Sequence, residues 1–158
     1  MFEMFKATIS KFKNSDENLK NEEIKNEEIK ALNSIVALLV EAASIDGEIG
    51  LDEKNQIKTI LTDQLNLETK KSDEILEEAI SNSSEQIEIW SKTNDIRKEL
   101  DYEERLNILE LMWEIVLVDD IIDVFEAQLM RRVSGLLYIS DIDSGNSKKR
   151  AIQKLKNN

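Results

Sequence analysis

The 158-residue sequence contains neither cysteine nor histidine. Without cysteine the chain can form no disulfide and no thiolate metal site. Without histidine it lacks the commonest transition-metal ligand and the commonest general base at neutral pH. A metal site in this chain must therefore use oxygen ligands, which favours hard cations such as Ca²⁺, Mg²⁺ or Mn²⁺ over Zn²⁺ or Cu²⁺.

Proline is also absent, and glycine occurs only four times. Both residues mark turns, so their scarcity favours helices joined by short connections. The length suggests one compact domain, and an apolar share of 41% is enough for a core. No stretch offers the roughly 20 apolar residues that cross a bilayer, and the N-terminus lacks the apolar core of a secretory signal. We therefore expect a cytoplasmic, all-α protein.

Basic residues are scarce outside the C-terminus. The net charge is −12. Residues 31–147 carry 10 basic and 26 acidic residues, whereas residues 148–158 carry five basic residues and no acid. An acidic body repels nucleic acid and attracts cations or basic protein partners. Solubility alone explains the acidity equally well.

Apolar residues recur with the period of amphipathic helices along most of the chain. Three pairs of residues have the spacing of helix start signals: Ser83 with Gln86, Asp101 with Glu104, and Ser140 with Asp143. The expected helices cover about residues 28–45, 51–65, 69–81, 83–100, 101–118 and 123–137, with a last one from Ser140 into the basic tail. Together they predict a compact bundle of about seven helices. Aromatic side chains expected in or near the core are Trp90, Tyr102, Trp113 and Phe125.

Residues 1–30 are expected to precede the helical domain, which we place at residues 31–158. Residues 1–13 predict a short amphipathic helix, because four apolar side chains recur at helical spacing with lysines between them. Residues 14–30 are polar and include a tandem NEEIK pentad, which suggests a linker and a solvated lead-in to the first core helix. We expect residues 1–13 to attach to the protein's own surface or to a second copy. Lipid binding is not favoured, because three lysines attract anionic lipid only weakly.

Two acidic segments, 73 residues apart, follow the same pattern. Residues 38–53 align with residues 111–126, and the alignment matches both acidic and apolar positions. The acidic pairs are Glu41 with Glu114, Asp46 with Asp119, and Glu53 with Glu126; the apolar pairs are Leu38 with Leu111, Ile45 with Val118, Ile57 with Met130, and Ile60 with Val133. The repeat predicts two helix–turn–helix halves with approximate internal symmetry.

Each half brings three carboxylates toward one turn. Helical spacing places Glu41 and Glu114 at the edge of the buried stripe, where an unpartnered carboxylate is unfavourable. Asp46 and Asp119 end that helix, and Glu53 and Glu126 begin the next. Three oxygen ligands on one hairpin form a candidate site for a hard cation. Further candidate ligands are Glu48 in the first copy and Asp120 or Asp123 in the second.

Helix capping explains part of this pattern without any cation. Asp123 and Glu126 have the spacing of a capping box, and Glu53 fills the same slot after Gly50. Acids in the first turn of a helix are also favoured by its dipole. The segment is not an EF-hand, because the sixth and twelfth positions counted from Asp46 are Leu51 and Ile57. Capping and cation binding both stay open at this point.

The repeated pattern resembles the tellurite-resistance TerB-like family, whose turns read Ala-Asp-Gly-x-Ile-x-x-x-Glu. Here it stands at residues 44–53 and 117–126, and residues 100–105 resemble the connector into the family's second half. The resemblance covers about residues 30–155. It implies a bundle of about seven helices, a cytoplasmic role in tellurite and other chemical stress, and an acidic metal site. The matching positions are Glu41, Asp46, Glu53, Glu114, Asp119 and Glu126.

This chain departs from the family pattern at three points. Ile45 and Val118 stand where the pattern has alanine, Asp120 replaces the glycine of the second turn, and Gly50 stands where the second copy has Asp123. The leading hypothesis is a non-enzymatic module that binds a divalent cation and uses no organic cofactor. The alternative is a metal-independent scaffold whose acidic surface binds a protein partner. A metal hydrolase would need an open coordination position and a substrate pocket, which the sequence does not indicate. Homo-oligomerisation stays open.

Overall fold

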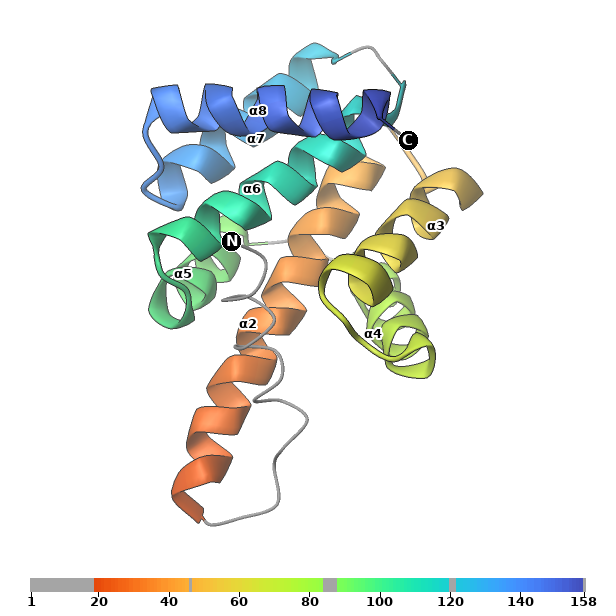
Figure 1. Cartoon of the computed structure of the whole chain (residues 1–158). Coiled ribbons are helices and arrows are strands. Elements are labelled where there is room, and N and C mark those ends of the chain that lie inside the picture. Colours follow the sequence, from red (N-terminus) through yellow and green to blue (C-terminus); the bar gives the residue numbers. More distant parts are fainter. Residues whose placement is uncertain (1–18, 46, 84–87, 120–121, 158) are drawn as a thin grey trace.

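The computed structural model describes residues 19–45, 47–83, 88–119 and 122–157. This part of the chain forms helices and turns without any strand, which confirms the all-α prediction (Figure 1). The seven α-helices are α2 (Leu19–Ser44), α3 (Leu51–Thr59), α4 (Thr69–Asn82), α5 (Ile89–Glu99), α6 (Tyr102–Val116), α7 (Val124–Leu136) and α8 (Asp141–Lys156). A π-helical turn, η1 (Ile60–Gln64), continues α3, and a 3₁₀ turn, η2 (Leu117–Asp119), continues α6. The helix predicted for residues 1–13 lies outside the described residues.

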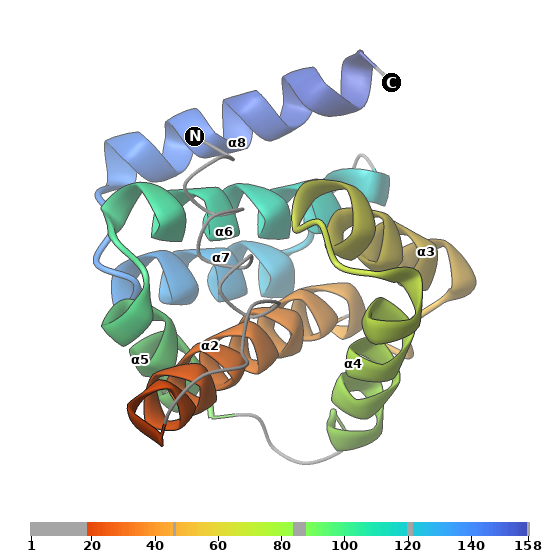
Figure 2. The same ribbon diagram turned by 60° about the horizontal axis from the view of Figure 1, so that its bottom comes forward.

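The helices α2 and α6 form the centre of the bundle and pack against each other. On its other sides α2 contacts α4 and α5, whereas α6 lies between α7 and α8 (Figure 2). The two central helices are therefore covered by different neighbours. This asymmetry decides the surroundings of the carboxylates that they carry.

The buried side chains of both halves form one core. Three of the four matched apolar pairs are buried in both copies: Leu38 with Leu111, Ile57 with Met130, and Ile60 with Val133. The fourth pair is less buried, since Ile45 is half-buried and Val118 is exposed. Matched burial agrees with a repeat, and superposition of residues 34–66 on residues 107–139 stays a prediction.

Two aromatic side chains expected in the core are on the surface. Trp90 is 59% exposed and Phe125 is 66% exposed. Each of these two residues stands next to a buried residue in the sequence. One step along a helix rotates the side chain by about 100°, which turns it away from the buried face. Trp90 follows buried Ile89, and Phe125 precedes buried Glu126. Trp113 is buried and Tyr102 is half-buried, as expected.

Two of the three predicted start signals are confirmed. Asp101 and Glu104 form a reciprocal capping box, with hydrogen bonds of 2.9 and 3.0 Å between backbone and side chain. The Ser140 hydroxyl accepts a hydrogen bond from the Asp143 backbone N–H at 3.2 Å. The third signal is wrong for Ser83, which ends α4 by donating its hydroxyl to the Ile80 carbonyl. Residues 84–87 lie outside the described residues, and α5 begins at Ile89.

The first helix begins earlier than the sequence pattern predicted. Residues 19–27, expected to precede the first core helix, belong to α2, whose N-terminal turns extend beyond the rest of the bundle (Figure 1). The NEEIK pentads explain this extension, because glutamate and lysine are good helix formers and stand three positions apart. The boundary of the domain at residue 31 stays a prediction.

Candidate functional site

The first acidic turn joins α2 to α3 and requires glycine at position 47. Gly47 has φ +144°, a conformation that side-chain-bearing residues rarely adopt. Its N–H donates to the Ser44 carbonyl at 3.1 Å and closes the end of α2. Asp46, a predicted ligand of this turn, lies outside the described residues. Glu48, a further candidate, is exposed.

Glu41 and Glu53 flank this turn, and both are half-buried. Neither side chain forms a hydrogen bond or ion pair with the described part of the chain. Burial raises the pKa of the Glu41 carboxyl above its ordinary value. The Glu53 carboxylate lies against Gly50, the N-cap of α3, so closely that a Cβ at position 50 would collide with its Oε2. The second copy has Asp123 at the position of Gly50. Because glycine has no side chain, position 50 leaves room for the Glu53 carboxylate at this turn.

The second acidic turn, between α6 and α7, has a different local structure. It begins with the 3₁₀ turn η2, which has no counterpart in the described residues after α2. Asp119 is the last residue of η2; its side chain and residues 120–121 lie outside the described part. Asp123 caps α7, because its Oδ1 accepts a hydrogen bond from the Glu126 N–H at 2.8 Å. The capping interpretation is therefore confirmed for Asp123, and the Glu126 side chain is buried and also has a partner.

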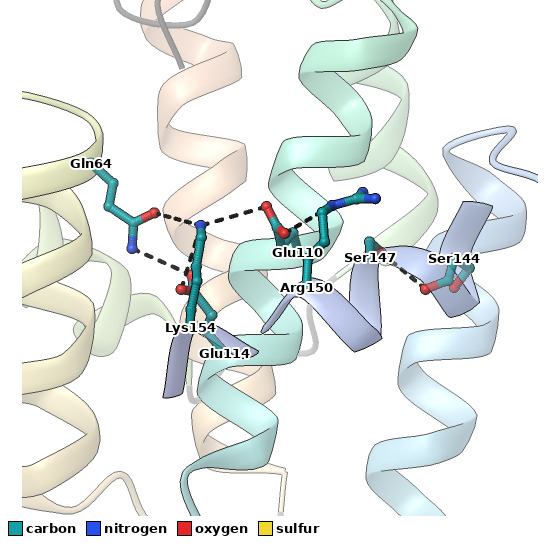
Figure 3. A network of polar contacts seen from close by, with 7 residues as sticks. All are labelled: Gln64, Glu110, Glu114, Ser144, Ser147, Arg150 and Lys154. Carbon is teal, nitrogen blue, oxygen red and sulfur yellow. Dashed lines mark hydrogen bonds and ion pairs between the residues drawn. The ribbon is translucent and has the colours of Figure 1, made fainter. Parts of the chain in front are cut away.

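Glu114, the match of Glu41, is 4% exposed and lies in a network of polar side chains (Figure 3). Its Oε1 lies 3.7 Å from Lys154 Nζ, on α8. Its Oε2 accepts a hydrogen bond of 3.3 Å from the side-chain amide of Gln64, in the π-helical turn η1. Unlike Glu41, this carboxylate is thus held by groups of the chain itself.

Glu110 lies one helical turn before Glu114 and is 3% exposed. Its Oε1 pairs with Arg150 Nε at 3.1 Å, and its Oε2 lies 3.5 Å from Lys154 Nζ. The Lys154 ammonium also donates to the Gln64 side-chain oxygen at 3.5 Å. Two basic residues of α8 therefore neutralise two buried glutamates of α6 (Figure 3). Ser147, one turn before Arg150 on α8, is also buried and donates its hydroxyl to the Ser144 carbonyl.

Burial dominates the electrostatics of Glu114 despite these partners. Loss of hydration raises the pKa of the Glu114 carboxyl, and the neighbouring Glu110 charge raises it further. The ammonium of Lys154 and the amide of Gln64 act in the opposite direction and only partly offset the burial. The negative charge on this side chain is therefore still penalised in the folded protein.

The comparison with protein families agrees with the motif. The family model described as "Tellurite resistance protein TerB" matches residues 32–149, well over half of the chain. The chain belongs to the TerB family. No curated protein and no solved structure matches the chain.

The TerB match contains both acidic turns but ends one residue before Arg150. Arg150 and Lys154, which neutralise Glu110 and Glu114, thus lie beyond the matched segment. Within the residues that the structure describes, no three Asp or Glu side chains are grouped closely enough to hold a metal ion. The six-residue ligand set stays a prediction, because the Asp46 and Asp119 side chains are not among those described. No helix in the described ranges is long and apolar enough to cross a membrane.

Four members of the network were not predicted from the sequence: Gln64, Glu110, Arg150 and Lys154. A signal for three of them was present, because Glu110 and Glu114 stand four residues apart on one helix and Arg150 and Lys154 stand four apart on another. Such spacing gives each helix one charged face. Gln64 gave no comparable signal, because the π-helical turn changes the direction of residues 60–64 relative to an ordinary helix.

Proposed function

We propose that this TerB family protein is a cytoplasmic, non-enzymatic module of the response to tellurite or other chemical stress, and that it binds a divalent cation at its first acidic turn. The observation that carries the cation proposal is the burial of the Glu41 carboxylate without a partner among the described residues. This half-buried carboxylate has no ion pair and no hydrogen bond with the described residues, and burial raises its pKa. A bound cation would supply the missing positive charge.

The donor chemistry of the first turn suits a hard cation. Glu53 places a second carboxylate against Gly50, at the end of the turn that follows Glu41. Asp46 and Glu48 are the further ligands that the sequence predicts there. Carboxylate oxygens without histidine or cysteine favour Ca²⁺, Mg²⁺ or Mn²⁺. The second turn is less suited, because Glu114 and Glu126 already have partners in the chain.

Calorimetric titration of the metal-free protein with Ca²⁺, Mg²⁺ and Mn²⁺ tests this proposal. We expect heat of binding and a raised melting temperature with at least one ion. Glu41→Gln or Asp46→Asn should abolish this binding and leave helicity intact, because neither change alters a buried apolar residue. Glu114→Gln and Asp119→Asn are the matched controls and should preserve the binding. Absence of heat and of stabilisation at millimolar metal would refute the cation proposal.

A metal-independent interaction scaffold is the second candidate function. It is favoured by α4, where Glu74, Glu77 and Glu78 are all exposed. Such an acidic surface would attract a basic protein partner and would steer its association in a salt-dependent way. This function predicts that metal has no effect, whereas replacing these three residues with glutamine weakens partner binding. The same titration therefore separates the two functions.

A further inference from the structure

The exposed side of helix α7 carries no acidic residue. This helix packs against α5 and α6 (Figure 2), and its only acid, Glu126, is buried. Val124 and Phe125 are exposed at its beginning, and Arg131 and Arg132 are exposed in its middle. Between residues 31 and 147 acids outnumber basic residues by 26 to 10, so this side of α7 is a local exception in an acidic protein.

Apolar and unpaired basic side chains share this side of the helix. The guanidinium groups of Arg131 and Arg132 form no ion pair or hydrogen bond with the part of the chain that the structure describes. They stand seven positions after Val124 and Phe125, which are 68% and 66% exposed. Seven residues are close to two helical turns, so all four side chains follow one side of α7. Aromatic residues and arginine are enriched where proteins bind one another, so the composition is that of an interaction surface.

Tyr138, two residues after the end of α7, has a backbone conformation that glycine usually adopts. Its φ is +57°, its N–H donates to the Gly135 carbonyl at 3.1 Å, and the Ile139 N–H donates to the Ser134 carbonyl at 3.0 Å. These two bonds form a Schellman motif, in which glycine is the usual residue at the left-handed position. Tyrosine is strained there. Since Tyr138 is 69% exposed, burial in the core does not compensate for the strain.

Arg97 of α5 holds the Tyr138 ring in place at the surface. The guanidinium carbon of Arg97 lies 4.4 Å from the ring centroid, which is the geometry of a cation–π contact. The same guanidinium donates hydrogen bonds to the Leu136 carbonyl and, at 3.0 Å, to the Asn94 side-chain oxygen. A ring that is already positioned loses little conformational entropy when a partner covers it. Tyr138 thus adds a fixed aromatic group next to the exposed side of α7.

We propose that Phe125, Arg131, Arg132 and Tyr138, together the α7 face, dock an acidic protein segment that also carries apolar side chains. Carboxylates of the segment pair with the two arginines, and its apolar side chains cover Phe125 and Tyr138. The cation proposal for the first acidic turn uses none of these residues, so the two proposals are independent.

Charge decides which occupant suits the α7 face. Two unpaired arginines attract carboxylates or phosphates. A membrane or a nucleic acid presents phosphates over a wide area and is repelled by the acidic body of the protein. A short protein segment contacts the α7 face alone, and salt screens its carboxylates from more distant acids. Residues 1–13 of the chain itself are unsuited, because they carry three lysines and one glutamate.

The probe is a fluorescently labelled synthetic helix with glutamates along one side and leucines along the other. Its binding to the full chain, measured by fluorescence anisotropy, should saturate and should weaken as salt is added. The double variant Arg131→Gln/Arg132→Gln should lose affinity by about tenfold or more, because both charge pairs are removed. Absence of saturable binding would overturn the proposal.

Lys149→Gln/Lys156→Gln is the matched control. Both lysines are exposed on α8, and the change in net charge equals that of the arginine variant. This control should change the affinity by less than about twofold, because the lysines lie outside the α7 face. Equal losses in the two double variants would show that the probe responds only to net charge, which would refute a specific face.

Two altered probes separate the charged from the apolar part of the recognition. A probe with lysine in place of glutamate should not bind, because it meets the arginines with like charge. A probe with alanine in place of leucine should bind several-fold more weakly, because Phe125 and Tyr138 lose their apolar partners. Full affinity of the alanine probe would contradict the role of the two aromatic side chains.

Tyr138→Gly distinguishes a binding role from a structural one. Glycine adopts the left-handed conformation without strain, so the melting temperature of this variant should be unchanged or higher. Its affinity for the probe should nevertheless fall, because the aromatic group is gone. A lower melting temperature together with full affinity would show that Tyr138 only stabilises the fold.

The other possible occupants have their own measurements, all made with a metal chelator present so that the cation proposal does not affect them. Vesicles containing phosphatidylserine should not cosediment with the protein, and the protein alone should not self-associate in sedimentation velocity. Cosedimentation that depends on Arg131 and Arg132 would assign the α7 face to lipid. Self-association that depends on them would assign it to a second copy. Either result would overturn the proposal of an acidic protein segment.

Discussion

Glu41 and Glu114 occupy matched positions in the sequence repeat, yet the fold gives them different electrostatic surroundings. Glu41 has no charged partner among the described residues, whereas Glu114 contacts Lys154 and Gln64. The difference comes from the neighbours of the two central helices. Helix α8, which carries the basic tail, packs on α6, whereas α2 is covered by α4 and α5. A repeat therefore predicts where a carboxylate lies along its helix, but not what lies opposite.

The two turns also differ in how the following helix begins. Asp123 caps α7 with its side chain, whereas Gly50 begins α3 without any side-chain hydrogen bond. In the second turn the acid is therefore used to stabilise the helix. In the first turn the absence of a side chain at position 50 leaves space for Glu53. Asp123 thus caps a helix in the second half, whereas its match in the first half, Gly50, leaves room for the Glu53 carboxylate.

The apolar parts of the two halves should behave alike. Leu38 and Leu111 are matched and completely buried. Replacing either with alanine should lower the free energy of unfolding by about 2–5 kcal/mol, because each leaves a cavity in the same core. Urea unfolding monitored by circular dichroism measures both losses. A loss below about 1 kcal/mol for only one of them would show that the halves contribute unequally to the core.

The charged side chains of the two halves should contribute differently to stability, and the largest contribution is expected from Glu110. Glu110→Ala should lower the free energy of unfolding by about 2 kcal/mol, because it leaves Arg150 without its carboxylate and Lys154 with fewer partners. The estimate lies below that for a fully buried pair, since both basic side chains are about one-third exposed. Glu103→Ala, an exposed change on the same helix, is the control and should alter stability by no more than about 0.5 kcal/mol. Equal losses for the two variants would mean that the network contributes no stability.

The beginnings of α7 and α3 supply a smaller contrast. Asp123→Ala removes a side-chain cap and should lower the free energy of unfolding by about 1 kcal/mol. Gly50→Ala should have little effect, because Gly50 has φ −81°, and the end of the Glu53 side chain can move away from the new Cβ. Thermal unfolding of the two metal-free variants checks this. A larger loss for Gly50→Ala would show that the position of Glu53 is rigid.

Neutralising Glu41 should have the smallest effect on stability, and its sign depends on pH. The pKa of Glu41 is raised in the folded protein, so its ionised form is penalised there. At pH 7 the metal-free Glu41→Gln protein should be the more stable one, by less than about 1 kcal/mol after solvent screening. This advantage should shrink as the pH falls through the raised pKa and vanish well below the ordinary value of 4.5, where the carboxyl is protonated in both the folded and the unfolded state. Denaturation curves at several pH values measure it, and an advantage that grows on acidification would contradict the assignment.

Much of the fold could be predicted from sequence because its signals are local. Apolar periodicity predicted the helices, and capping residues such as Asp101 and Ser140 marked two starts correctly. The burial predicted for Trp90 and Phe125 was wrong, because a difference of one position along a helix moves a side chain to another face. The continuation of α2 through the NEEIK pentads was also missed, because polar composition was interpreted as a linker although its residues favour a helix.

The candidate site could be predicted only in part. The repeat located Glu41, Glu53, Glu114 and Glu126 at the ends of helices, where the structure places them. It could not show that Lys154 lies opposite Glu114, since the two residues are 40 positions apart and meet only when α8 packs on α6. Nor could it show the π-helical turn that directs Gln64 to the same carboxylate. The partners of a buried charge are set by tertiary packing, which local patterns do not encode.

The most direct test follows the side-chain carboxyl ¹³C resonances of Glu41 and Glu114 during one calcium titration of the unmodified protein. Among the described residues Glu41 has no charged partner, whereas Glu114 lies beside Lys154. We predict that the Glu41 resonance shifts and saturates with calcium, and that the Glu114 resonance stays in place, because Lys154 and Gln64 already hold that carboxylate. A Glu114 response at lower calcium than that of Glu41, or one shared midpoint for both, would contradict the distinction between the two turns.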